Sequence, residues 1–230
     1  MQSTIVRRRS LLRLGVAGMA SAAAAGTMSA SEPDTPTQPA TSGAPQTPTA
    51  SGARPRVLLA FFSRAGWNYH NGGRTYLQTG NTEVLAGIIS RLISCAVHRI
   101  RALDPYSDDY DDTVARNVRE QNANARPAIA NPLASIDQYD TVLLASGIWN
   151  VRAPMIMSTF ADSYDFTGIT VYPVTTYAMS GLGTAERDYA ASCRGATLGA
   201  GLAVRGEDVG DAQSTVEAWL REHQLLAQHP

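Results

Sequence analysis

Short apolar runs alternate along most of this chain with segments that carry their apolar residues at helical spacing. The run 57–62 is continuously apolar, which is typical of a strand covered on both faces. Such alternation predicts an α/β protein of three layers, with a five-stranded, doubly wound parallel sheet between two layers of helices. We expect strands at 57–62, 96–103, 141–145, 169–176 and 196–204, and helices at 82–93, 109–125, 154–164, 184–192 and 211–226.

The expected helices differ in the apolar surface that they offer. Segment 82–93 carries apolar doublets at 84/85, 88/89 and 92/93, which line one helix face. Segment 109–125 carries only Tyr110, Val114 and Val118 as a thin stripe. We therefore expect most of that second helix to face solvent.

The first 55 residues have a composition unlike the rest. Residues 7–13 read Arg-Arg-Arg-Ser-Leu-Leu-Arg, and an Ala-rich apolar stretch follows at 14–25, too short for a convincing membrane span. This pattern resembles a twin-arginine (Tat) signal peptide over residues 1–30, with an ordinary Sec signal as the alternative. Residues 31–55 are rich in Pro, Thr and Ser and predict a disordered linker. We expect one folded domain at 56–226, exported to the periplasm or the cell exterior, with no stable membrane span in the mature form.

The charges exclude one class of partner. The chain has 19 basic and 20 acidic residues, and every basic residue is Arg. Without the four arginines of the expected signal peptide the net charge is about −5, which gives no basic stripe for nucleic acid.

Ligands of doubly wound sheets lie beyond the carboxyl ends of the strands, where strand order reverses, so the loops after strands one, three and four matter most. The first of them begins with Ser63, Arg64 and Ala65, continues through an insertion at 66–78, and ends in Gly80, Asn81 and Thr82 at the start of a helix. Hydroxyls, a glycine and free N–H groups at a helix N-terminus predict a phosphate site. Alternatively, Ser63 and Thr82 simply cap the helix.

The Gly80-Asn81-Thr82 ending resembles the phosphate loop of the flavodoxin family. One branch of that family has an insertion in this loop and also reads like this chain at 139–142, 181–183 and 205–206. The resemblance covers residues 56–222. It implies the strand order 2-1-3-4-5 and FMN as cofactor, with phosphate contacts from Ser63, Asn81 and Thr82 and from the backbone of Arg64 and Gly80.

The other two loops are expected to hold the flavin ring. Trp149 could cover one face of a flat tricyclic ring, or it could be a core side chain. Tyr177 is the candidate for stacking on the ring or for a hydrogen bond to it, with ordinary loop packing as the alternative. The residues expected around the ring are Ser146, Gly147, Ile148, Trp149, Asn150, Tyr177, Ser180, Gly181 and Gly183.

Two departures from the related branch affect these loops. The relatives more often have Trp-Gly where Asn150 and Val151 stand, and His-Gly-Gly where Tyr177, Ala178 and Met179 stand. The first departure puts the shape of the ring pocket in question. The second implies that a proton-donating histidine of the relatives is missing here.

The resemblance leaves three functions open: an electron carrier between proteins, a reductase of a small quinone-type molecule, and a binding module that has lost FMN. The aromatic insertion, in which His70 could face a substrate, favours the reductase. No catalytic residue is assigned beyond the candidates Tyr177 and His70. An exported flavoprotein has no ordinary NAD(P)H supply, so a quinol or another redox protein is expected as donor.

Neither a metal site nor a disulfide is expected. Asp108, Asp109, Asp111 and Asp112 lack the spacing of a calcium-binding loop and suit a helix start. In the order 2-1-3-4-5, Cys95 and Cys193 lie near opposite edges of the sheet, roughly 19 Å apart at about 4.8 Å per strand. A disulfide needs Cα atoms within about 7 Å, so two free thiols are predicted.

Overall fold

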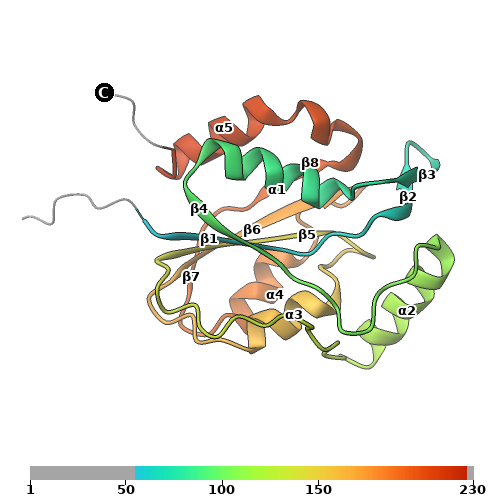
Figure 1. Cartoon of the computed structure of the whole chain (residues 1–230), viewed down its shortest axis with the longest axis horizontal. Coiled ribbons are helices and arrows are strands. Elements are labelled where there is room, and N and C mark those ends of the chain that lie inside the picture. The colour runs from blue at the N-terminus through green and yellow to red at the C-terminus, as the bar shows by residue number, and fades with distance from the viewer. Residues whose placement is uncertain (1–54, 227–230) are drawn as a thin grey trace, which may run out of the picture. The chain divides into compact units, whose positions relative to one another are not determined.

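The computed structural model describes residues 55–226, which form an α/β fold (Figure 1). The signal peptide and nearly all of the linker expected from the sequence lie outside this part of the chain. Within 55–226, no helix is both long and apolar enough to cross a membrane. The thiols of Cys95 and Cys193 are both free, as predicted.

A parallel sheet forms the centre of the fold, in the order β4-β1-β5-β6-β7, with β8 also paired to β6. This is the order 2-1-3-4-5, so the predicted fold is confirmed. The strands are β1 (Val57–Phe61), β4 (Cys95–Arg99), β5 (Thr141–Gly147), β6 (Thr170–Tyr177), β7 (Thr197–Leu198) and β8 (Leu202–Arg205).

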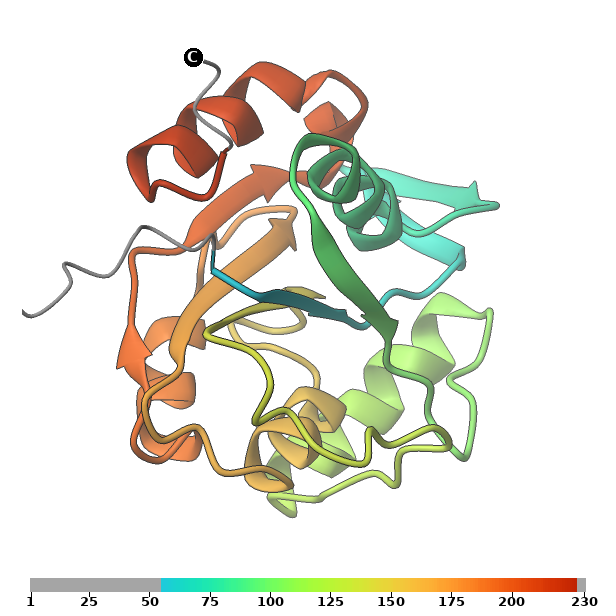
Figure 2. The same ribbon diagram turned by 60° about the vertical axis from the view of Figure 1, so that its left-hand side comes forward.

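Successive β1 side chains point to opposite sides of the sheet, and all of them are apolar and buried. Both faces of the sheet are therefore covered by helices. Val57, Leu59 and Phe61 face α1 (Asn81–Leu92) and α5 (Gln213–Glu222). Leu58 and Ala60 face α3 (Met155–Asp162) and α4 (Ala185–Ser192). Figures 1 and 2 show these two layers on either side of the sheet, with α2 (Tyr110–Asn122) beside α3.

The insertion at 66–78 forms an antiparallel hairpin that the sequence analysis did not predict. Strand β2 (Gly66–His70) pairs with β3 (Gly73–Leu77) through a two-residue turn, in which Asn71 and Gly72 have φ of 46° and 82°. An Asn-Gly pair suits such a turn because both residues tolerate positive φ. The dipeptide was the signal that could have revealed the hairpin.

The expected fifth strand, 196–204, is divided into β7 and β8. The Val171 carbonyl accepts from the Gly199 N–H, so alternate residues of β6, including Pro173, face this edge strand. Proline has no N–H to donate, and the ladder is interrupted opposite it. The expected closing helix, 211–226, is shorter in the structure: it is α5, and the 3-10 helix η1 (Gly206–Asp211) precedes it.

Most of α2 is exposed, as expected, but its packed face is not the stripe of Tyr110, Val114 and Val118. Thr113, Asn117 and Glu120 are buried, whereas Val114 and Val118 are 42% and 40% exposed. The buried side chains keep polar partners: Thr113 donates to the Ser107 carbonyl at 2.8 Å, and Glu120 accepts from Tyr106 and Arg116. The valine stripe faces the cavity described next.

Candidate functional site

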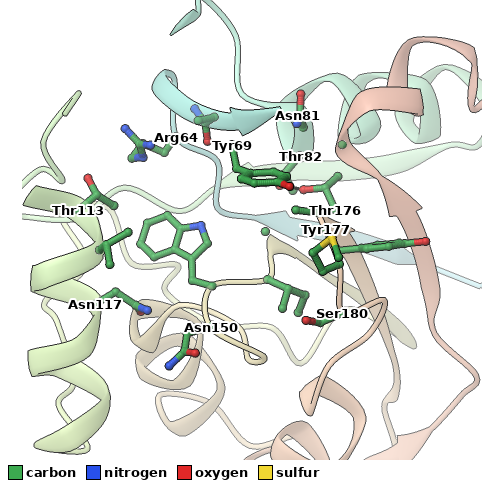
Figure 3. Close-up of a pocket in the computed structure, with 18 of the residues that line it drawn as sticks. Arg64, Tyr69, Asn81, Thr82, Thr113, Asn117, Asn150, Thr176, Tyr177 and Ser180 are labelled. Carbon is green, nitrogen blue, oxygen red and sulfur yellow. Dashed lines mark hydrogen bonds between the residues drawn. The ribbon is translucent and has the colours of Figure 1, made fainter. Parts of the chain in front are cut away.

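A cavity of about 560 Å³ lies beyond the carboxyl ends of β1, β5, β6 and β8. Its size is within the range of small-molecule and cofactor sites. The loops after these strands form most of its wall, and α2 and strand β2 of the hairpin complete it. Figure 3 shows Arg64, Tyr69, Asn81 and Thr82 along one side, and Asn117 and Asn150 on the opposite side.

The N-terminus of α1 forms one end of the cavity, with Ser63, Asn81 and Thr82 in its wall. The Ser63 hydroxyl accepts from the Glu83 N–H at 3.1 Å, so this serine does cap the helix. The Thr82 hydroxyl lies 2.8 Å from that of Thr176, and both side chains are buried. Capping uses a lone pair of Ser63 and leaves its proton free to donate, so capping and anion binding are compatible.

Gly80 and Arg64 shape this end of the cavity. A Cβ atom on Gly80 would overlap the Ser63 hydroxyl and the Arg64 carbonyl, so only glycine lets the loop fold back on itself. The Arg64 guanidinium donates to the carbonyls of Ser107, Asp108 and Trp67 and thereby ties the loop to the start of α2. Burial lowers the Arg64 pKa from its usual value, and its Nε is buried without a partner in the described region.

The hairpin contributes Asn68 and Tyr69 to the cavity wall. The rings of Trp67 and Tyr76 pack edge to face, 5.8 Å apart, and both side chains are 45% exposed. His70 is exposed at the hairpin tip, beside Asn71, and is not among the residues that line the cavity. The structure therefore does not place His70 toward a substrate in this cavity.

Trp149 lies in the cavity wall and is half-buried. Its indole packs edge to face against Phe62 and Tyr106, with ring centroids 5.8 and 5.2 Å away. Gln121 of α2 donates to the Trp149 carbonyl at 2.9 Å. The two alternatives for Trp149 thus combine, because the same side chain joins the core and faces the cavity.

The backbone after Trp149 makes a tight turn with two left-handed residues. Asn150 and Val151 have φ of 50° and 64°, and the Trp149 N–H donates to the Arg152 carbonyl at 2.8 Å. Asparagine tolerates this conformation, but a β-branched valine is strained in it. The backbone is therefore the one a glycine would favour, although valine occupies the position.

The loop after β6 lines the cavity with Tyr177, Ala178, Met179 and Ser180. Gly181 and Gly183 lie outside the wall, and both have positive φ. Gly183 packs against the Val151 carbonyl, so the two ring-side loops are in direct contact. Among the expected ligands, Ala65, Gly80 and Ser146 also lie outside the wall; Ser146 is 1% exposed and sits in the core beside Tyr189.

Sequence reasoning missed the wall formed by α2 and the residues after β8. The spacing of Val114 and Val118 on an otherwise polar helix was a signal for a second apolar surface. The cavity carries little charge: the only charged side chains in its described wall are Arg64 and Glu207. The missed wall residues are Phe62, Asn68, Tyr110, Thr113, Val114, Asn117, Val118, Val151, Thr176, Ala178, Met179, Gly206 and Glu207.

These features define a doubly wound α/β protein with a cavity of cofactor size beyond the strand ends, which has a helix N-terminus and the indole of Trp149 in its wall. The sequence matches the flavodoxin family over residues 74–223. The chain belongs to the flavodoxin family. Flavodoxins bind FMN, and family membership assigns this cofactor to the site.

Solved structures show the same fold. A candidate flavoprotein from Bacteroides uniformis is 27% identical, with a TM-score of 0.59, over 74% of this chain and 99% of its own. Another, from Bacteroides eggerthii, is 24% identical with a TM-score of 0.60, over 74% and 98%. A flavoprotein from Lactobacillus acidophilus, solved in complex with FMN, is 17% identical with a TM-score of 0.51, over 70% and 99%. No curated protein matches the sequence.

The residues of the cavity fit FMN. At the start of α1 a bound phosphate would meet hydroxyl donors and helix N–H groups. The Nε of Arg64, the residue after Ser63, is a buried donor without a partner in the described region. The flat ring would lie in the part of the cavity that has Trp149 in its wall. Gly80, which has no room for a Cβ atom, brings the start of α1 close to Ser63 and Arg64.

Proposed function

We propose that this protein is an exported, FMN-dependent reductase of a planar, apolar small molecule of the quinone type. The observation that carries the proposal is the small number of charged side chains and the exposed apolar side chains in the cavity wall. Val114 and Val118 on α2 line the same cavity as Val151 and Met179 of the two loops, and the charged side chains of the described wall are limited to Arg64 and Glu207.

The phosphate end accounts for cofactor binding. Ser63, Thr82 and Asn81 would hold the phosphate together with the N–H groups at the start of α1, where the helix dipole favours an anion. Trp149 would cover the ring. Bound FMN supplies a centre that accepts two electrons and releases them as a pair or singly.

The ring end accounts for the acceptor. Met179 is 77% exposed and Val151 53% exposed, which leaves apolar surface at the mouth of the cavity. Burial of that surface against an apolar acceptor would contribute roughly 25 cal/mol per Å². A planar molecule stacked against the flavin gains this energy, whereas a charged one loses its hydration there.

A second candidate function, an electron carrier between proteins, is favoured by the acidic start of α2. Asp108, Asp109, Asp111 and Asp112 are exposed beside Tyr110, which lines the cavity. A negative patch at the cofactor edge would steer a basic redox partner toward it.

Export rests on the resemblance of residues 1–30 to a Tat signal peptide. That pathway moves folded proteins, so FMN taken up in the cytoplasm would travel with the chain. The electron donor outside the cytoplasm would be a quinol or a membrane-bound or secreted redox protein. Fractionation of cells that carry the full chain, with Arg7 and Arg8 replaced by Lys as a control, tests this proposal.

The test of function uses the purified chain from residue 31 onward. We expect a yellow protein that binds FMN stoichiometrically and riboflavin far more weakly, because riboflavin lacks the phosphate. Equal affinity for FMN and riboflavin would contradict the phosphate site, and a colourless protein that ignores FMN would contradict the function.

The reduced protein then distinguishes the two candidate functions. A reductase passes electrons to a neutral benzoquinone at a rate that salt does not change. A carrier reduces a basic redox protein faster than the quinone and slows as salt screens the acidic patch.

A further inference from the structure

The inserted hairpin is attached at both of its sides. On one side Arg74 makes two hydrogen bonds to Asp111 of α2, at 2.8 and 2.7 Å, and its guanidinium lies 4.4 Å from the centre of the Tyr110 ring. The Trp67 N–H also donates to the Asp108 carbonyl at 2.8 Å. The hairpin is thereby fastened to the first turn of α2 (Figure 1).

On the other side, the hairpin turn is fastened to Glu207 of η1. Glu207 Oε1 accepts from the Asn71 N–H at 2.9 Å, and its side chain is only 7% exposed. Its Oε2 is buried without a hydrogen bond in the described region, although the Arg205 Nε lies 3.4 Å away. Burial alone would raise the Glu207 pKa, but the Asn71 N–H and the nearby positive charges hold it below its usual value, so the carboxylate is ionised at neutral pH.

The hairpin and Glu207 meet at the phosphate end of the cavity. Glu207 lines the cavity, and so do Asn68 and Tyr69 of β2. The residue before Glu207, Gly206, packs so closely against the Asn81 side chain that a Cβ atom there would overlap it. Asn81 is one of the expected phosphate ligands, so the Glu207 backbone adjoins the phosphate position.

We propose that the hairpin is a strap across the phosphate end, and that the strap and Glu207 restrict the site to a mononucleotide. The inference rests on the proposed binding of FMN. In FAD a second phosphate and an adenosine extend from the position of the FMN phosphate. The second phosphate would meet the Glu207 carboxylate at short range, where like charges repel strongly, and the adenosine would have to pass the strap.

The same strap also restricts release. The phosphate of bound FMN leaves through its own end only if the contacts of Asn71 with Glu207 and of Arg74 with Asp111 open. An exported protein has no cytoplasmic pool from which to reload FMN, so slow release would be useful to it.

The experiment compares FMN and FAD on the purified chain from residue 31 onward. Flavin fluorescence gives both dissociation constants, and excess apo-flavodoxin as a trap gives the FMN release rate. We expect the unaltered protein to bind FMN at least 100-fold more tightly than FAD. In the double variant Glu207→Ala/Arg74→Ala, we expect that preference to fall at least tenfold and FMN release to accelerate by a similar factor.

Two further variants separate charge from attachment. Glu207→Gln retains an acceptor for the Asn71 N–H but removes the charge, so it should admit FAD while changing FMN release less than the double variant does. Asp208→Ala removes an exposed neighbouring carboxylate and should change neither quantity. Glu207→Gln also serves if the double variant does not fold.

The outcomes are distinguishable from those of the functional proposal. FMN binding by the unaltered protein tests the proposed function itself. If FMN binds but FAD binds equally well, or if Glu207→Gln and the double variant leave the preference unchanged, the strap proposal is overturned while the FMN site stands.

Discussion

Gly183 and Val151 approach so closely that no side chain fits between them. A Cβ atom on Gly183 would overlap the carbonyl oxygen and carbon of Val151, and the Thr184 N–H donates to the same oxygen at 2.8 Å. This contact fixes the loop after β6 against the turn after β5. The two ring-side loops are therefore a single unit, although neither glycine of the second loop lines the cavity.

Replacement of Gly183 by Ala should destabilise the protein by about 3 kcal/mol or more, because left-handed strain and steric overlap add. Gly181→Ala is the matched control: its φ of 56° is nearly the same as the 55° of Gly183, but no atom lies within 4 Å of its added Cβ. The control should lose only about 1 kcal/mol. Urea unfolding measures both, and equal losses would show that the Val151 contact is unimportant.

Val151→Gly should raise the free energy of unfolding by about 1 kcal/mol, because relief of the left-handed strain outweighs the entropy that glycine adds to the unfolded chain. Val97→Gly provides the contrast. Val97 is similarly exposed, at 52%, but lies in the extended strand β4, so glycine there should destabilise by about 0.5–1 kcal/mol. Changes of the same sign at both positions would contradict the strain assigned to Val151.

Trp149→Ala should weaken FMN and riboflavin alike, by about tenfold or more, because it removes a ring contact that both ligands share. Ser63→Ala should weaken FMN alone, because only FMN has the phosphate. Trp149→Phe retains the edge-to-face packing with Phe62 and Tyr106, and it serves as the folded control. If Trp149→Ala leaves both affinities unchanged, the ring does not lie beside this indole.

Asp188 should make stability depend on acid pH. Although burial would raise its pKa, hydrogen bonds from Thr184 and Arg187 and the charge of Arg152 hold it below the usual value. Because the folded-state pKa is depressed, the ionised Asp188 stabilises the folded protein fully above the unfolded-state pKa of about 3.9. This stabilisation is lost as the pH falls through the folded-state pKa. Asp188→Asn should cost about 1 kcal/mol at pH 7 and progressively less below about pH 4.

Urea unfolding of Asp188→Asn at pH 7 and pH 3 measures this difference. Asp211→Asn, at an exposed carboxylate, should match the unaltered protein at both values. A cost for Asp188→Asn that is the same at pH 7 and pH 3 would contradict the assigned ionisation.

The two thiols should react slowly in the native protein and rapidly only after unfolding. Burial raises the pKa of Cys193 to about 12 and also raises that of Cys95, so little thiolate exists at pH 8. Titration without reductant should count two thiols in the denatured protein, and native protein should react slowly, with Cys193 the slower. A denatured count of zero at unchanged monomer mass would require a disulfide across the sheet.

Much of the fold was predictable because a strand that is buried on both faces has a continuously apolar sequence, as in the run 57–62. The part of the cavity at the start of α1 was also predictable, since Ser63, Asn81 and Thr82 are contiguous with one strand end and one helix start, and all three line the cavity. The part of the wall formed by α2 was not predictable, because the spacing of Val114 and Val118 is the same for a helix that packs on a core and for one that lines a cavity. The role of Glu207 depends on a contact with Asn71, 136 residues away, and no local pattern encodes that contact.

The interruption of the edge strand opposite Pro173 also affects how the molecule behaves toward copies of itself. At the break the Gly201 N–H is bound by Glu186, and the Ala200 carbonyl by the Trp219 indole. An incoming strand would find these groups already bound, because the edge is split into the two residues of β7 and the four residues of β8. Open sheet edges are where folded chains recruit one another into aggregates. The break therefore leaves this edge without a long uninterrupted strand on which a second copy of the chain could pair.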